Sequence, residues 1–494
     1  MRAIRSLTII LLAAATGPAP AAAQPTGADA LSHERRAIEA FEAGEYRAAA
    51  EAFRAQIELD PKNFVPRYNL SNALAASGQT EAALAALERS IELGMSDAAR
   101  LRTDPALDPL RDRPGFRRIL EHWDAIVEAQ RAARLERDRT LVGRGVDETA
   151  LGALRVDVLS AYPERSTELG IEQARRVAEW AEGVLGLEPA EEGDAWVVVA
   201  MPDRGNFRRW AIAALGGGAA GVATVGGAYE HDDRRLVTRD LSATLRHEFF
   251  HVLHWRDMER RGQRQPYWIQ EGLASLVEDI DAAPGERPAV RLAPSWRTNI
   301  VQRNAELNTL KPLAALASSG RRLFTGSRSL AHYAQARETF RFLRDRGELA
   351  AWYAAYTTDP DVGFEADPTG VRAIEAVTGL GASAFDTAFE AWVQSQPPVP
   401  EDLGELARER GLAPGFEVSP GSGEGPRVVR VTPGVRRSSG LRPGDVLLTV
   451  DGMPVGEPQE LARRLASSRA GASIAIGYRR GRLYGVAEVV MGAR

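Results

Sequence analysis

Two histidines and a glutamate within one short segment could hold a metal ion and use it. The segment His247-Glu248-Phe249-Phe250-His251 places the histidines four residues apart. On a helix, both imidazoles lie on one face and can reach a single ion at about 2.0–2.1 Å. Glu248 lies beside His247, where its carboxylate can take a proton from a water at the open metal position. The pattern predicts a catalytic zinc site. The alternative is a hydrogen-bonded histidine pair in a core, which burial makes costly.

A third ligand is needed, because catalytic zinc usually has three protein ligands and a water. A histidine six residues after His251 is excluded, since position 257 is Asp257. A glutamate on a following helix is another solution, and the helical segment 266–274 supplies Glu271. With this segment the chain resembles the gluzincin metallopeptidases of the peptidase-MA-like group, related to aminopeptidase N and thermolysin. These pair His-Glu-x-x-His with a Glu-Gly-x-Ala helix. The resemblance implies Glu271 as third ligand of one Zn²⁺ per chain, and Gly272 as the residue that lets those two helices pack closely.

Two further titratable residues lie near these motifs. Glu278 follows Glu271 by two helical turns, and related sequences often keep an acid there. Its side chain would either orient a zinc ligand or be solvated. His254 would lie about 10 Å along the helix axis from His247, which is too far to share an ion. We therefore expect His254 to be a histidine at the edge of the pocket or a packed histidine.

Hydrolysis also needs a hydrogen-bond donor for the oxyanion that forms in the transition state. The segment 329–336 contains His332 and Tyr333 and begins a helix expected to end near Leu343. Gluzincins commonly use a tyrosine or histidine donor, so the resemblance implies Tyr333 first and His332 second. Plain helix packing is the alternative for both residues.

The resemblance covers about residues 150–395 and is specific only at the two motifs. The Gly-x-Met-Glu-Asn motif, with which aminopeptidase N relatives hold the free amine of the substrate, is absent. The absence of this motif disfavours an aminopeptidase, so endopeptidase action is favoured by default. The glycine-rich stretch 216–227, with residues 222–225, is expected to form an edge strand that pairs with substrate.

Hydrophobic periodicity predicts the elements that must position these residues. The expected elements are strand 155–159, helix 172–187, strand 196–201, strand 235–237 and a helix from about Asp240. After residue 256 the pattern is mostly helical. A small sheet followed by helices is an α+β arrangement. The resemblance implies that residues 150–395 form a gluzincin-like zincin domain of this class.

The N-terminal part repeats with a period of about 34 residues. Gly44 and Gly78 hold equivalent places within residues 30–94. This resembles two tetratricopeptide repeats in an all-α superhelix, whose groove would hold a protein partner or serve only as a spacer. Two repeats bury little core, so a cap is expected within residues 30–123. Residues 124–149 are expected to be a linker helix.

After a proline-rich stretch, residues 401–494 predict a mainly-β domain. Strands are expected over 427–431, 445–450, 473–478 and 485–490, with one helix over 458–465. The run 440–452 (Gly-Leu-Arg-Pro-Gly-Asp-Val-Leu-Leu-Thr-Val-Asp-Gly) resembles the PDZ domains of bacterial envelope proteases. The resemblance implies that Leu412, Gly415 and Phe416 form a loop that captures the C-terminal carboxylate of a peptide. The alternative is a domain that docks on its own protease and binds nothing else.

The N-terminus carries the pattern of an export signal. Residues 1–23 combine an early positive charge, a short apolar run and a small-residue cleavage site. The apolar run is shorter than the ~20 residues that span a bilayer, which disfavours the alternative of a membrane anchor. We expect an exported protein, periplasmic or secreted, with no transmembrane segment after signal removal.

Length and composition narrow the classes of protein and the kinds of site that remain. A length of 494 residues suggests roughly three domains beyond the signal. The net charge of −5 disfavours a protein that coats nucleic acid. Because cysteine is absent, disulfides, thiolate metal sites and a cysteine nucleophile are excluded.

Three functions stay open. The first is an exported zinc endopeptidase acting on protein or peptide substrates. The second is a non-catalytic envelope scaffold that uses the repeat and PDZ modules, against which the intact Glu248 argues. The third is a zinc amide hydrolase that acts on cell-wall peptides.

Overall fold

The structure is a computed structural model of the whole chain. It describes residues 27–96, 98–142, 146–190, 195–201, 204–215, 226–230, 234–282, 290–324, 329–421 and 423–493. The predicted export signal (1–23) and the predicted edge strand (222–225) lie outside the described residues. Within the described part, no helix combines the length and apolar character needed to cross a bilayer.

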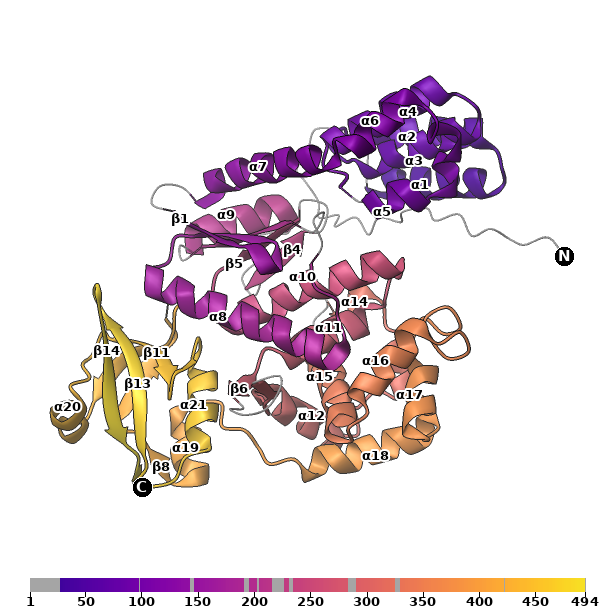
Figure 1. Ribbon diagram of the computed structural model, residues 1–494. Coiled ribbons are helices and arrows are strands. Elements are labelled where there is room, and N and C mark those ends of the chain that lie inside the picture. The colour runs from indigo at the N-terminus through magenta and orange to yellow at the C-terminus, as the bar shows by residue number, and fades with distance from the viewer. Residues whose placement is uncertain are drawn as a thin grey trace.

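The N-terminal region is a stack of helices with its own core (Figure 1). Its elements are α1 (Gly27–Glu42), α2 (Tyr46–Leu59), α3 (Val65–Ala76), α4 (Thr80–Glu92), α5 (Ala98–Thr103), the 3₁₀ helix η1 (Pro105–Leu110) and α6 (Pro114–Glu121). Phe53 and Leu87, at equivalent places of the repeat, are both buried in this core. Asp104 accepts hydrogen bonds from Tyr68 (2.7 Å) and Asn72 (2.9 Å) and so joins the segment expected as a cap to α3.

The helix expected as a linker is instead a layer of the central region. Helix α7 (Trp123–Val142) lies along one face of the central sheet, and its Leu135 belongs to a core with three strands. Arg131 holds the buried Asp157 through two bonds of 2.6 and 2.5 Å, and Asp138 accepts from Arg235 at 2.9 Å. Two charges of α7, those of Arg131 and Asp138, therefore pair with charges on the sheet.

The central sheet has the order β1-β2-β3-β5-β4. Its strands are β1 (Asp147–Leu151), β2 (Val156–Ser160), β3 (Trp196–Ala200), β4 (Gly227–Glu230) and β5 (Arg235–Thr238). The expected strands are confirmed as β2, β3 and β5, which run parallel. The antiparallel edge strand β1 was not expected, and the antiparallel edge strand β4 begins at Gly227, at the end of the stretch in which an edge strand was expected. The parallel strands are buried on both faces because helices cover both. Helices α7 and α9 (Arg204–Leu215) lie on one face, and α8 (Glu164–Trp180) and α10 (Ala243–Arg261) on the other.

The second half of the central region is helical around α15. Its elements are α11 (Tyr267–Leu276), the hairpin β6 (Ile280–Ala282) and β7 (Val290–Leu292), α12 (Trp296–Glu306), α13 (Leu313–Ala317), α14 (Arg321–Phe324), α15 (Ser329–Asp345), α16 (Leu349–Thr358), α17 (Val371–Thr378) and α18 (Ala382–Ser395). Phe340 of α15 is stacked on Trp268 of α11 at 4.9 Å and packs on Trp352 of α16 at 4.7 Å. This aromatic group fixes α11, and with it Glu271, against α15.

The role expected for Gly272 was wrong in one respect. A Cβ at this position would lie 2.6 Å from the ring of Phe340 and 3.0 Å from the carbonyl oxygen of Ala336. Gly272 therefore permits a close approach of α11 to α15, not of α11 to the helix that carries the two histidines.

Replacing Gly272 with alanine is expected to destabilise the protein by about 1–2 kcal/mol. Alanine gains about 1 kcal/mol of helix propensity, but overpacking costs about 1–3 kcal/mol. The upper end of the range for overpacking applies, because Phe340 is fixed between Trp268 and Trp352 and cannot move aside. Denaturant titration would measure the change, with Gly320→Ala as control, since a Cβ there meets nothing. Equal stability of the two variants would contradict this packing.

The C-terminal domain has a separate sheet and core, with the order β14-β13-β11-β10-β9. Its elements are α19 (Leu403–Arg410), β8 (Leu412–Ala413), β9 (Phe416–Ser419), β10 (Arg427–Val431), α20 (Pro433–Ser439), β11 (Val446–Val450), β12 (Met453–Pro454), α21 (Pro458–Ala466), β13 (Ser473–Arg480), β14 (Leu483–Val490) and β15 (Gly492–Ala493). All four expected strands and the expected helix are present.

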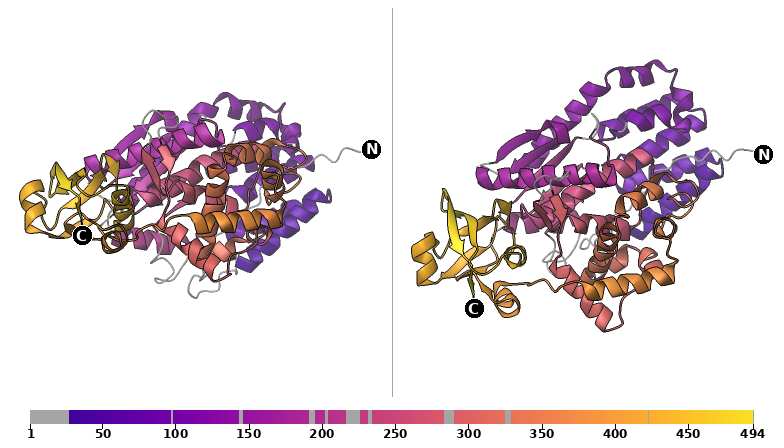
Figure 2. Two further views of the ribbon diagram at one scale, coloured as in Figure 1. Left: turned by 90° about the horizontal axis from the view of Figure 1, so that it is seen from below. Right: turned by 60° about the horizontal axis from the view of Figure 1, so that its bottom comes forward.

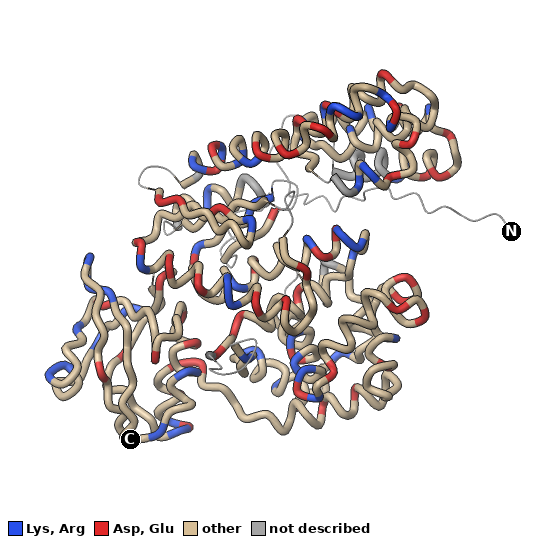
Figure 3. Tube along the Cα trace, viewed as in Figure 1, with Lys and Arg blue, Asp and Glu red and all other residues tan. Residues whose placement is uncertain are grey.

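Figure 2 shows this domain and the N-terminal helices at opposite ends of the central region. Basic and acidic residues are interspersed along all three parts (Figure 3).

Candidate metal centre

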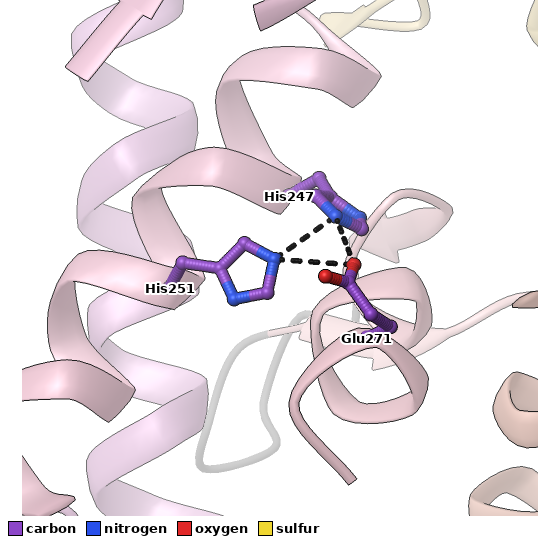
Figure 4. A group of neighbouring side chains, drawn as sticks. All are labelled: His247, His251 and Glu271. Carbon is purple, nitrogen blue, oxygen red and sulfur yellow. Dashed lines mark hydrogen bonds and ion pairs between the residues drawn. The ribbon is translucent and has the colours of Figure 1, made fainter. Parts of the chain in front are cut away.

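Three side chains from two helices converge on one point. His247 and His251 project from α10 toward Glu271 of α11 (Figure 4). The two Nε2 atoms lie 3.1 Å apart, and Oε2 of Glu271 lies 3.3 Å from Nε2 of His247 and 3.4 Å from Nε2 of His251. All three residues are buried. The structure thus brings together the three residues that were expected as ligands.

This triangle has the size of a metal site. Ligand atoms held tetrahedrally at about 2.0–2.1 Å from an ion lie about 3.3 Å from one another. The three measured separations bracket that value. Two imidazoles and one carboxylate are also a donor set that zinc accepts. The residues present therefore fit a zinc ion.

Glu248 lies next to His247 on α10 and borders strand β4. A Cβ on Gly227 of β4 would lie 3.0 Å from Cγ of Glu248. Burial raises the pKa of Glu248, while the charges of His247 and His251 oppose that shift. A carboxylate whose pKa is raised toward neutral is a better acceptor of a proton near neutral pH.

Glu278 contacts the centre through His247. Its Oε1 accepts from Nδ1 of His247 at 2.9 Å, and Arg297 of α12 donates to both carboxylate oxygens at 2.8 Å. Burial raises the pKa of Glu278, but the charge of Arg297 and the bond to His247 outweigh it and lower it to about 2. Glu278 is therefore charged. Its carboxylate bonds to Nδ1 of His247, so Nε2 is the ring nitrogen of His247 that faces His251 and Glu271.

The pKa of His247 shows how strongly this centre favours positive charge. Burial alone lowers that pKa, yet the bonds to Glu271 and Glu278 raise it to about 10. Burial likewise raises the pKa of Glu271, but His251 and His247 bring it well below its usual value. The carboxylates of Glu271 and Glu278 thus stabilise a positive charge at His247.

Tyr333 reaches the centre from α15. Its ring lies 6.3 Å from that of His247, and the guanidinium of Arg297 lies 5.7 Å from its ring. Burial, followed by the carboxylates of Glu271 and Glu248, raises the pKa of Tyr333 well above its usual value. The hydroxyl therefore keeps its proton. His332, the other candidate, is buried and packs on Phe324 at 5.9 Å.

His254 is a packed histidine, as expected. It is fully buried, and its Nε2 lies 2.9 Å from Oε1 of Gln265. Burial lowers its pKa to about 4, so it is neutral. It does not belong to the group that could hold a metal.

Sequence reasoning missed two residues at this centre. Tyr229 of β4 stacks on His251 with ring centroids 4.7 Å apart. Arg297 holds Glu278 from α12. No sequence motif marks either residue. Tyr229 comes after a glycine-rich stretch, and Arg297 lies in a helix that is separated from the two motifs by a hairpin, so neither stands at a fixed spacing from the ligands. The described edge strand is β4, which begins at Gly227, directly after the segment where a strand was expected.

The proposed carboxylate loop of the C-terminal domain leads into an edge strand. Leu412 belongs to β8 and pairs with Ala493, and the side chains of Leu412 and Phe416 are buried in the core. Gly415 has a φ of 72°, and its carbonyl accepts from the N–H of Thr432 at 2.9 Å. Any recognition by this loop would therefore use its backbone. β9, which begins at Phe416, is the last strand of the sheet in the described part of the chain.

Comparison with known proteins identifies the N-terminal helices. The family model "Tetratricopeptide repeat" matches residues 40–103. These residues are tetratricopeptide repeats. The period of the sequence and the paired helices of the structure agree with that match.

Two curated proteins resemble short parts of the chain. The magnetosome formation protease MamE of Magnetospirillum gryphiswaldense is 45% identical over 64 residues, which are 13% of this chain and 8% of that protein. A chloroplastic protein of Arabidopsis thaliana is 30% identical over 93 residues, 18% of this chain and 28% of that protein. The chain thus spans less than a third of either relative. One of the two is named as a protease.

One solved structure is a distant neighbour. It is an aminopeptidase N family protein from Idiomarina loihiensis, 13% identical, with a TM-score of 0.20 over 70% of this chain and 67% of that one. A likeness at this level supports no statement on fold or activity.

Proposed function

We propose that this protein is a zinc-dependent peptidase of gluzincin type that hydrolyses peptide bonds within protein or peptide substrates. The observation that carries this proposal is the buried triangle of His247, His251 and Glu271, whose donor atoms have tetrahedral spacing. The presence of Glu248 beside this triangle favours an enzyme over a scaffold, because a scaffold has no use for a buried base at a metal site.

The side chains around the triangle suit hydrolysis. A bound zinc ion would supply a Lewis acid that polarises the substrate carbonyl and acidifies water. Glu248 would take a proton from the attacking water and pass it to the leaving amine. Tyr333, protonated because its pKa is raised, would donate a hydrogen bond to the oxyanion. Strand β4, at the edge of the sheet beside Glu248, would pair with the main chain of the substrate.

We assign Glu278 the role of orienting His247. Replacing Glu278 with glutamine is expected to weaken zinc binding by about 10–100-fold, because a carboxylate that accepts from Nδ1 fixes the ring and raises its basicity. Competition with a chromophoric chelator would measure the affinity. Glu172→Gln is the matched control, since Glu172 pairs with Arg176 on the surface of α8. Unchanged affinity in the Glu278 variant would contradict the assignment.

Cleavage of a peptide library tests the whole proposal. The full-length protein is expected to cut internal peptide bonds, to lose this activity with a chelator and to regain it with zinc. Cell-wall muropeptides in the same assay would reveal the alternative, a zinc amide hydrolase. Failure to cut any substrate while zinc is bound would favour the scaffold.

We also propose roles for the flanking parts and a location. The repeats would hold a protein partner in their groove, and the C-terminal domain would act as a PDZ domain that adds the C-terminus of a peptide to the edge of β9. Both would raise the local concentration of protein substrates. Export to the periplasm or beyond rests on the pattern of residues 1–23 alone.

A further inference from the structure

Helix α21 of the C-terminal domain forms ion pairs and hydrogen bonds with the segment that follows α11. Arg463 and Arg464 both donate to Asp281, at 2.9 and 2.8 Å. Arg464 also donates to the carbonyl of Ile280 at 2.9 Å, and Arg463 lies 3.3 Å from Asp279. Both arginines are buried. These bonds fix the short stretch that begins directly after Glu278, the residue that contacts His247.

A second connection runs to the helix of the metal centre. Arg246 immediately precedes His247 and is fully buried. Its guanidinium donates to Glu460 of α21 at 3.0 Å and to Gln173 of α8 at 3.1 Å. It also donates to the backbone carbonyl of Glu278. Glu278 is thereby held at two ends, with its backbone bound by Arg246 and its carboxylate by Arg297.

The two domains also touch where α10 begins. The N–H of Leu241 donates to the carbonyl of Gly423 at 3.1 Å. A Cβ on Gly456, which comes just before α21, would lie 1.7 Å from Oγ of Ser242, the residue that precedes the first turn of α10. No side chain fits between the domains at this point.

The ion pairs of this interface are better suited to fixing the relative position of the two domains than to adding to the stability of the fold. Three arginines (246, 463 and 464) meet three acids (279, 281 and 460), all within a buried or mostly buried contact. Buried ion pairs add little net stability, because desolvation offsets their attraction. They do impose a fixed geometry, since each charge must meet its partner.

We infer that the C-terminal domain is a positioning part of the metal centre. Through Glu460, Arg463 and Arg464 it fixes Arg246 and the segment 278–281, and these in turn hold the carboxylate of Glu278 on His247. The inference rests on the proposed role of the triangle as a zinc site. It gives the C-terminal domain a task beyond peptide capture, because a displacement of α21 would be transmitted to a metal ligand.

The first variant disturbs the contact between the two domains without removing any charge. In the full-length protein, Gly456→Ala would force α21 away from Ser242, and the double variant Gly456→Ala with Ser242→Gly would restore the room. Gly434→Ala is the control, because a Cβ there meets nothing and Gly434 lies in the same domain. The probe is Zn²⁺ alone, titrated against a chromophoric chelator, with circular dichroism to count the folded fraction.

Zinc affinity of folded Gly456→Ala is expected to fall by about 10-fold or more, as for other residues that orient metal ligands. The double variant should regain it, and Gly434→Ala should match wild type. Glu460→Gln, which keeps the shape of the side chain, provides a second variant with the same expected loss. Lower stability with unchanged affinity in both Gly456→Ala and Glu460→Gln would overturn the inference alone. Absence of zinc binding in wild type would overturn the proposed function and this inference with it.

Discussion

Glu248→Gln is expected to reduce peptide hydrolysis by about 10²–10⁴-fold while zinc content stays at the wild-type level. The amide cannot accept the proton of the attacking water, and loss of a positioned acid–base group has an effect of this size. Glu248 is adjacent to the triangle but is not one of its three corners, so the metal should remain. Initial rates on a peptide identified from the library would measure the loss.

A matched control lies on the same helix. Glu259→Gln removes a charge near the C-terminal end of α10, where Glu259 faces Arg234 at 3.7 Å. This variant should keep wild-type rates. Equal activity of Glu248→Gln and wild type would contradict the assignment of Glu248 as the base.

Tyr333→Phe is expected to lower kcat by about 10²–10³-fold with little change in KM. An oxyanion donor acts mainly in the transition state, so its loss appears in kcat rather than in substrate binding. The phenyl ring keeps the packing against Phe324 and Arg297. Steady-state kinetics at several substrate concentrations would separate the two constants.

The neighbouring histidine provides the comparison. His332→Gln should leave kcat near wild type, because Tyr333 is the proposed donor and the ring of His332 packs on Phe324. A large loss in this variant together with normal turnover of Tyr333→Phe would reassign the donor to His332.

The metal centre was largely predictable because its key spacing is local. Helical geometry alone places His247 and His251 on one face, and the apolar residues around them predict a buried helix. Glu271 needed the family resemblance, since it comes from a different helix. Glu278 could be named as a candidate for contact with a ligand, but no local pattern connects Arg297, which donates to its carboxylate, to the motif.

Errors arose where a residue's partner comes from far away in the chain. Gly272 was assigned to the wrong helix pair, because a glycine indicates a close approach without indicating what approaches. Residues 124–149 were expected to form a linker helix, yet Arg131 and Asp138 pair with charges on the sheet. Likewise, the helix over 458–465 was expected, but no local pattern connects its Arg463 and Arg464 to residues 279–281, against which both are buried.

The most direct test of the account is the zinc content of the purified full-length protein, measured by elemental mass spectrometry. We expect about one zinc per chain in wild type, and loss or strong weakening in both His251→Ala and Glu271→Ala, because each removes one of three protein ligands. His254→Ala is a useful comparison and should keep its zinc, since His254 bonds to Gln265 outside the triangle. A wild-type protein without zinc that takes up none on reconstitution would contradict the account, and so would a bound zinc that both ligand variants retain.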